Sequence, residues 1–173
     1  MTETRLKKLP LDRYRIVHFA THGLLAGETA IIDKAGAEPA LVLIPPAHVS
    51  ADDDGLLTAS EITTLKLNAD WVVLSACNTA GAAGTSSAEA LSGLARAFFY
   101  AGARALLVSH WEVYSEAAVK LTTRAFAEIA ADPNVSRAEA MRRSMAAMIG
   151  SGGWDAHPAY WAPFIVVGEG AAR

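Results

Sequence analysis

Cysteine is nearly absent from this sequence, and its scarcity excludes several classes of protein. The single cysteine, Cys77, can form neither an internal disulfide nor a cluster of thiolate ligands. A chain without a disulfide framework suits a reducing compartment, so we expect a cytoplasmic protein. Two roles remain open for Cys77, that of a small apolar core residue and that of a nucleophile.

Long apolar runs and concentrated positive charge are also lacking. No stretch reaches the roughly 18 apolar residues of a membrane span, and the first residues lack the apolar centre of a signal peptide. The formal net charge is −3, and the lysines and arginines are scattered rather than clustered. We therefore expect neither a membrane nor a nucleic acid as a partner.

Apolar, β-rich runs alternate with helical patterns along the chain. The predicted strands cover 14–20, 39–44, 71–76, 103–109 and 163–168. The predicted helices cover 86–102, 115–131 with Ser115 as N-cap, 136–150 and a shorter segment capped by Thr58. One hairpin is expected within 29–44, turning at 34–36. Apolar strands separated by helices predict an α/β fold whose mostly parallel sheet is covered on both faces.

Polar residues follow three of the predicted strands, where ligands of open parallel sheets bind. His22 follows the first strand, Cys77 the third and His110 the fourth. Parallel strands would bring His22 and Cys77 to one edge, although 55 positions separate them. An imidazole beside a thiol can take its proton, and the N–H groups of Gly23 and Cys77 could form an oxyanion hole. A structural α/β domain with a buried, unreactive thiol is the alternative.

Five motifs follow one another along the chain: IVHFATHG (16–23), DGLLTASEI (54–62), VVLSACNTA (72–80), GLARAFFYAGARALLVSHW (93–111) and HPAYWAPFIVVG (157–168). Their sequences and order resemble the CHAT family, which comprises caspase-like cysteine proteases often found behind tetratricopeptide repeats. The resemblance implies a caspase-like three-layer α/β/α fold and hydrolysis of protein or peptide substrates. It also implies a dyad of His22 and Cys77, an oxyanion hole at Gly23 and Cys77, and no metal or organic cofactor.

The resemblance also suggests where a substrate pocket would lie. Its candidate residues are Asn78, His110, Trp111 and Glu112. Many relatives carry acidic residues shortly after the tryptophan, and this chain offers Glu112 and Glu116 there. A carboxylate at this place would select a basic residue before the cleaved bond. Asp52, Asp53 and Asp54 in the long loop are a third candidate for this acidic group. The alternatives are solvated roles for Glu112 and Glu116, and a polar turn at 52–54.

Relatives in this family commonly have a further strand and helix upstream. We therefore expect residues 1–173 to be a single CHAT domain that lacks its N-terminal strand. The sheet edge exposed in this way would invite pairing with a second copy of the chain. The resemblance further implies a repeat-containing sensor or activator as a partner. A catalytically silent caspase-like scaffold, acting as a protein-interaction module, is the alternative function.

Overall fold

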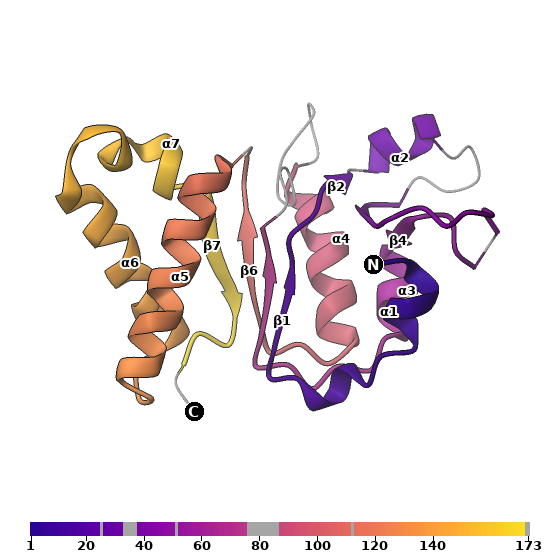
Figure 1. Ribbon diagram of the computed structural model, residues 1–173, viewed down its shortest axis with the longest axis horizontal. Helices are drawn as coiled ribbons and strands as arrows, with labels where there is room; N and C mark the ends of the chain where they lie inside the picture. The colour runs from indigo at the N-terminus through magenta and orange to yellow at the C-terminus, as the bar shows by residue number, and fades with distance from the viewer. Residues whose placement is uncertain (25, 33–37, 51, 76–86, 112, 172–173) are drawn as a thin grey trace.

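A four-stranded sheet lies between two layers of helices in the computed structural model of the chain (Figure 1). The structure describes residues 1–24, 26–32, 38–50, 52–75, 87–111 and 113–171. The strand order is β1-β5-β6-β7, with β1 at Ile16–Phe19, β5 at Trp71–Leu74, β6 at Ala105–Ser109 and β7 at Phe164–Gly168. Neighbouring strands are parallel from β1 to β6, whereas β7 is antiparallel to β6. The expected α/β fold with a mainly parallel sheet is thus confirmed.

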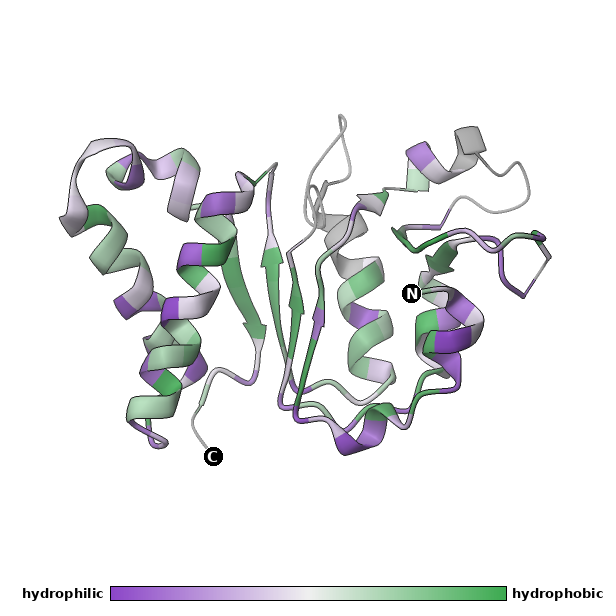
Figure 2. Cartoon of the chain, in the orientation of Figure 1, coloured by the Kyte–Doolittle hydropathy of each residue, from purple (hydrophilic) through white to green (hydrophobic). Residues whose placement is uncertain are grey.

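Burial on both faces explains why the central strands are apolar throughout. Every residue of β5 and β6 is buried, and alternate side chains enter two separate cores. Val72 and Leu106 pack towards helix α4 (Ser87–Tyr100), whereas Trp71 and Leu107 pack towards α5 (Ser115–Ala131) and α6 (Arg137–Ser151). Figure 2 shows this continuous hydrophobic character along the strands.

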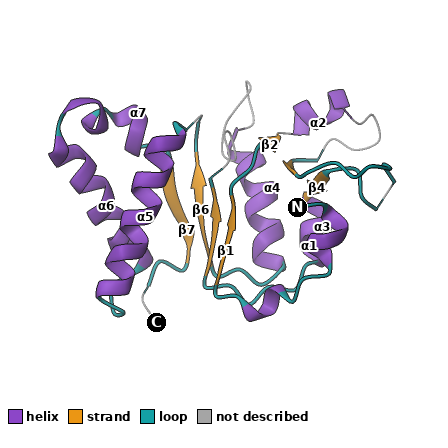
Figure 3. Ribbon diagram, viewed as in Figure 1, coloured by secondary structure: helices purple, strands orange, loops and turns teal. Residues whose placement is uncertain are grey.

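Helices cover both faces of the sheet, as the purple ribbons on either side of the orange strands show (Figure 3). One face carries α1 (Glu3–Lys7), α3 (Ala59–Thr64) and α4 (Ser87–Tyr100). The other carries α5 (Ser115–Ala131), α6 (Arg137–Ser151) and the short α7 (Pro158–Trp161). Two 3-10 turns lie at Leu11–Arg13 and Gly153–Ala156.

The predicted helices are present with small shifts at their ends. Thr58 caps α3 in a full capping box with Glu61, and the Ser136 hydroxyl accepts the Glu139 N–H at the start of α6. The prediction for Ser115 is wrong by one position. Tyr114 is the N-cap of α5 and its side chain makes no capping hydrogen bond, so Ser115 is the first helical residue.

A second, three-stranded antiparallel sheet replaces the hairpin expected within 29–44. It consists of β2 (Gly23–Leu24), β3 (Ala40–Val42) and β4 (Leu56–Thr58), with β3 in the middle. The first arm of the expected hairpin instead belongs to helix α2 (Ala26–Ile32), and the expected turn at 34–36 lies outside the described residues. The prediction failed because both edges of β3 are occupied by strands from outside 29–44, so β3 needs no partner from within it.

One carboxylate ties together the chain segments that enter three strands. Asp70 precedes β5 and binds Arg15, which precedes β1, at 2.5 Å and Arg104, which precedes β6, at 2.6 Å. Burial disfavours the charged carboxylate, but the two guanidinium hydrogen bonds outweigh burial and hold the pKa of Asp70 below its ordinary value. The amino ends of the strands are therefore fixed relative to one another.

Candidate active site

His22 lies three residues after the end of β1 and directly before β2, in an exposed turn that connects the central sheet to the small sheet. Two hydrogen bonds attach this turn to β3. The Val42 N–H donates to the His22 carbonyl at 2.8 Å, and the Thr21 hydroxyl donates to the Val42 carbonyl. The backbone that carries the imidazole is therefore attached to β3 through His22 itself and through the preceding Thr21. The turn remains exposed at the surface.

Gly23 begins β2 and pairs with Leu41 of β3. Because His22 makes the ladder bond to Val42, the alternation of antiparallel pairs makes Gly23 and Leu41 a pair without ladder hydrogen bonds. The Gly23 N–H is consequently directed away from β3. A glycine at this position also leaves no side chain between that N–H and an approaching group.

The carboxyl ends of β1 and β5 lie side by side. Phe19 is in register with Leu74, and the Ser75 N–H donates to the Phe19 carbonyl at 3.2 Å. Ser75 is the last described residue before the segment 76–86. Cys77 and Asn78 belong to that segment and lie outside the described residues.

A hollow of about 310 Å³ opens at this edge of the sheet. His22 and Ser75 both line it, and helix α5 supplies the opposite wall with residues such as Ala118 and Thr122. Its full lining is His18, Ala20, Thr21, His22, Ser75, Val113, Ser115, Ala118, Val119 and Thr122. Hydroxyls, imidazoles and small apolar groups thus surround a space large enough for one side chain.

A larger hollow of about 730 Å³ lies elsewhere along β1, between that strand, α1 and residues 42–45. Its walls are mainly apolar, with Leu6, Leu9 and Ile44 among them. His18 and Thr21 border both hollows, but His22 lines only the smaller one. The larger of the two hollows therefore lacks the combination of polar side chains that catalysis requires. The smaller hollow is the candidate site because it combines titratable and hydroxyl groups.

A second histidine, His18, faces the same hollow from within β1. Its Nε2 lies 2.7 Å from the Ser75 hydroxyl. Partial desolvation lowers the pKa of His18, a solvent-exposed residue of β1, because it disfavours the charged imidazolium. The lowered pKa favours the neutral imidazole, in which one ring nitrogen can donate and the other accept.

The residues expected to form a substrate pocket are only partly brought to this hollow. His110 follows β6 and stacks on the neighbouring Trp111 with ring centroids 6.3 Å apart, but neither residue lines the hollow. Glu112 lies outside the described residues, as does Asn78. Glu116 is exposed in the first turn of α5 and is not part of the lining.

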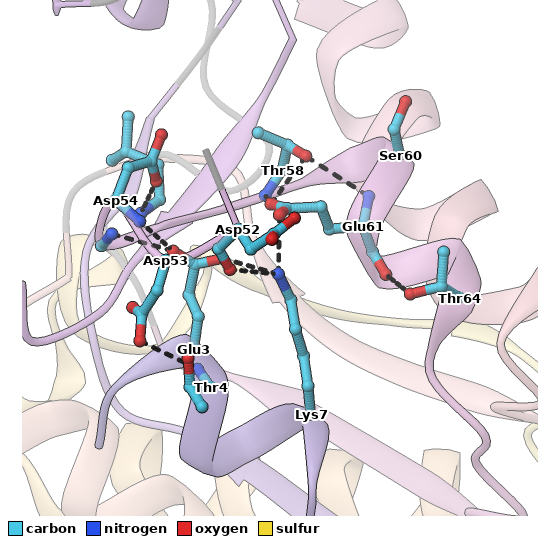
Figure 4. Close-up of polar contacts among 12 residues, drawn as sticks. Glu3, Thr4, Lys7, Asp52, Asp53, Asp54, Thr58, Ser60, Glu61 and Thr64 are labelled. Atoms are coloured by element: carbon cyan, nitrogen blue, oxygen red, sulfur yellow. Dashed lines mark hydrogen bonds and ion pairs between the residues drawn. The ribbon is translucent and has the colours of Figure 1, made fainter. Parts of the chain in front are cut away.

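Asp52, Asp53 and Asp54 form the polar turn that was the alternative to a binding role (Figure 4). The Lys7 ammonium donates to the Asp52 carbonyl at 2.9 Å, and the Thr4 N–H donates to the Asp53 carboxylate at 3.2 Å. These contacts attach α1 to the long loop. None of the three acids lines the hollow beside His22.

Sequence reasoning missed the contribution of Ser75 and of the α5 wall. Ser75 is an ordinary polar residue at the end of an apolar run, and its bond to His18 depends on how β1 and β5 align. The helical pattern of 115–131 likewise does not reveal that Ala118 and Thr122 face β1. His18 and His22 are four positions apart, a spacing that would place both side chains on one face of a strand that continued to His22. This spacing is the one signal available beforehand.

The structure also bears on metals and membranes. Within the described ranges, no group of three or more His, Cys, Asp or Glu side chains is arranged to hold a metal ion. None of the helices in the described part of the chain has both the length and the apolar character needed to cross a bilayer.

Comparison with known proteins places the chain in a family. It is similar to the protein "Tetratricopeptide repeat protein 28" of Mus musculus, with 35% identity over 117 residues. The similarity covers 66% of this chain but only 4% of the mouse protein. The CHAT domain family model matches residues 1–169, so the chain belongs to the CHAT domain family.

Proposed function

We propose that this chain is a caspase-like cysteine endopeptidase that uses His22 and Cys77 as its catalytic dyad. The observation that carries the proposal is the shared hollow of His22 and Ser75 at the carboxyl ends of two parallel strands. Membership of the CHAT family supports it, because the histidine and cysteine motifs both occur in this chain.

The short stretch of chain between Ser75 and Cys77 limits the distance between these two residues. Cys77 is two residues beyond Ser75, and two extended residues span at most about 7 Å between Cα atoms. Chain connectivity is therefore compatible with a dyad of Cys77 and His22. This restriction follows from chain connectivity and from the place of Ser75.

The proposed reaction follows from the groups at this edge. His22 takes the Cys77 proton, and the thiolate attacks the peptide carbonyl carbon to form a C–S bond. The N–H groups of Gly23 and Cys77 stabilise the oxyanion. His22 then returns the proton to the leaving amine as the C–N bond breaks, and water hydrolyses the thioester to release the acid and restore the thiol.

The substrate pocket is a further part of the proposal. Asn78, His110, Trp111 and Glu112 are proposed to border it, and Glu112 adjoins Val113, which lines the hollow. The Glu112 carboxylate would pair with a basic side chain before the cleaved bond. A peptide library profiled for cleavage tests this part, and a flat or acidic preference at that position would contradict it.

The setting of the enzyme is proposed from its family. A tetratricopeptide repeat protein is among its relatives, so we propose a repeat-containing sensor or activator as partner. We also propose a cytoplasmic location, because a single free thiol suits a reducing compartment. We further propose that residues 1–173 form one caspase-like domain, and that the outer edge of β1 can pair with a second copy.

The test compares three variants of the full chain. Cys77→Ala and His22→Ala should each abolish cleavage of fluorescein-labelled casein and labelling by a peptide chloromethyl ketone. His48→Ala, which changes an exposed loop histidine, is the matched control and should behave as the unmodified chain. Unchanged cleavage by Cys77→Ala would refute the dyad. Absence of cleavage in every variant, also with a repeat-containing partner added, would favour the silent scaffold.

A further inference from the structure

His18 and Ser75 form a side-chain pair that the proposed reaction does not use. We propose that His18 is a positioning residue, whose imidazole holds Ser75 and thereby the end of β5 that leads into Cys77. The inference rests on the proposed function, since it concerns how the same nucleophile is presented.

The geometry makes this pair a connection between two strands. His18 is in register with Val73, and Ser75 lies two residues beyond Val73, directly after the end of β5 and on the same face. The Nε2–Oγ distance of 2.7 Å is that of a hydrogen bond, and the Ser75 N–H is also bound to the Phe19 carbonyl. Ser75 is thus held by its backbone and by its side chain, immediately before the nucleophile segment.

A serine hydrogen-bonded to a histidine could also be a nucleophile with its base, but the backbone argues against that role. The Ser75 N–H is occupied by the Phe19 carbonyl at 3.2 Å, so it cannot stabilise an oxyanion at its own site. The same bond continues the β1–β5 ladder by one step and holds Ser75 directly after Leu74, the last residue of β5. Positioning is the role that these bonds permit.

The surroundings of His18 fit a neutral imidazole. His22 lines the same hollow from β1's end, and α5 contributes the Ser115 and Thr122 hydroxyls. A neutral His18 can hold Ser75 without placing a second positive charge beside the His22 imidazolium that forms in the proposed reaction.

Alkylation of Cys77 by iodoacetamide provides the test, because the chain has one cysteine and every modification reports on it. His18→Phe fills the space without the hydrogen bond, and Ser75→Ala removes only the hydroxyl. Each should slow alkylation and casein cleavage about fivefold, the effect of one hydrogen bond. His18→Gln, whose amide can replace the Nε2 contact, should recover most of the rate. The double variant His18→Phe/Ser75→Ala should be no slower than either single variant.

Several results would overturn the proposal. Full alkylation and cleavage rates in Ser75→Ala would show that the pair positions nothing. Additive losses in the double variant would show that the two residues act separately. Loss of rate in His18→Gln equal to that in His18→Phe would show that shape, not the hydrogen bond, matters.

The two proposals can fail separately. If casein cleavage survives Cys77→Ala, the peptidase dyad is wrong, whatever the alkylation rates show. If cleavage depends on Cys77 and His22, but substitutions of His18 and Ser75 change neither the alkylation rate nor the cleavage rate, only the positioning role is wrong. Loss of thermal stability in His18→Phe without any change in alkylation would assign a purely structural role and refute the inference.

Discussion

Substituting Gly102 by alanine should destabilise the chain strongly, because two separate costs coincide at this residue. Gly102 follows α4, and its φ of +107° is a conformation that side chains other than glycine rarely adopt. Holding alanine there costs about 1–3 kcal/mol. The added Cβ would also lie 2.2 Å from the Leu67 carbonyl oxygen. The Leu67 backbone cannot easily retreat, since its N–H donates to the Ala101 carbonyl at 2.7 Å.

Overpacking of this kind adds about 1–3 kcal/mol, so we expect Gly102→Ala to lower the free energy of unfolding by about 2–6 kcal/mol. Urea unfolding followed by circular dichroism measures the change. Gly150→Ala is the matched control, because this residue is in α6 and a Cβ there meets nothing within 4 Å. The control should raise stability by about 0.5–1 kcal/mol. A Gly102→Ala variant within about 1 kcal/mol of the unmodified chain would refute the reasoning, since strain alone should exceed it.

Two further predictions concern the polar bonds that order the strands and helices. Asp70→Asn should lower the free energy of unfolding by about 1 kcal/mol near neutral pH, a modest loss because the Arg15 side chain is 75% exposed. The folded pKa of Asp70 is depressed, so its contribution is present above the unfolded pKa of about 4 and fades as pH falls through the folded value. Urea unfolding at pH 7 and pH 3 should show the variant and the parent converging; a gap that widens in acid would contradict the sign. Thr58→Ala removes one half of the capping box of α3 and should cost about 0.5–2 kcal/mol by the same assay, whereas Thr58→Ser should retain most of the stability.

The sequence was sufficient to predict the central sheet and its helices, because the strands and the helices each have a strong and distinct pattern of apolar residues. Apolar runs such as 71–74 and 105–109 are buried on both faces, and the pattern of 115–131 matches α5 at both ends. The region 26–44 gave a weaker signal. Its isoleucines favour a strand, yet Thr29 donates to the Ala26 carbonyl at 2.9 Å within helix α2, so local bonding prevails over β propensity.

The position of His22 was predictable from the ends of the strands, whereas the hydrogen bonds that attach its turn to β3 were not. A residue that follows a parallel strand must lie at the carboxyl edge, whatever the details of packing. The bond from Val42 to the His22 carbonyl, in contrast, requires β3 to pair with β2. That pairing joins residues about twenty positions apart through a segment whose apolar pattern also suits other partners.

The His18–Ser75 bond depends on strand register, and the apolar pattern of β5 cannot specify that register. Because β5 is buried on both faces, a slip by one residue would still bury apolar side chains everywhere, but it would turn Ser75 to the face opposite His18. Two features outside the pattern fix the alignment. Trp71 needs the space beside Phe126, where the ring centroids are 5.4 Å apart, and Asp70 binds Arg15 one step before Trp71 meets Ile16. The ion pair at the amino edge of the sheet therefore helps to determine which side chains meet at the opposite, carboxyl edge.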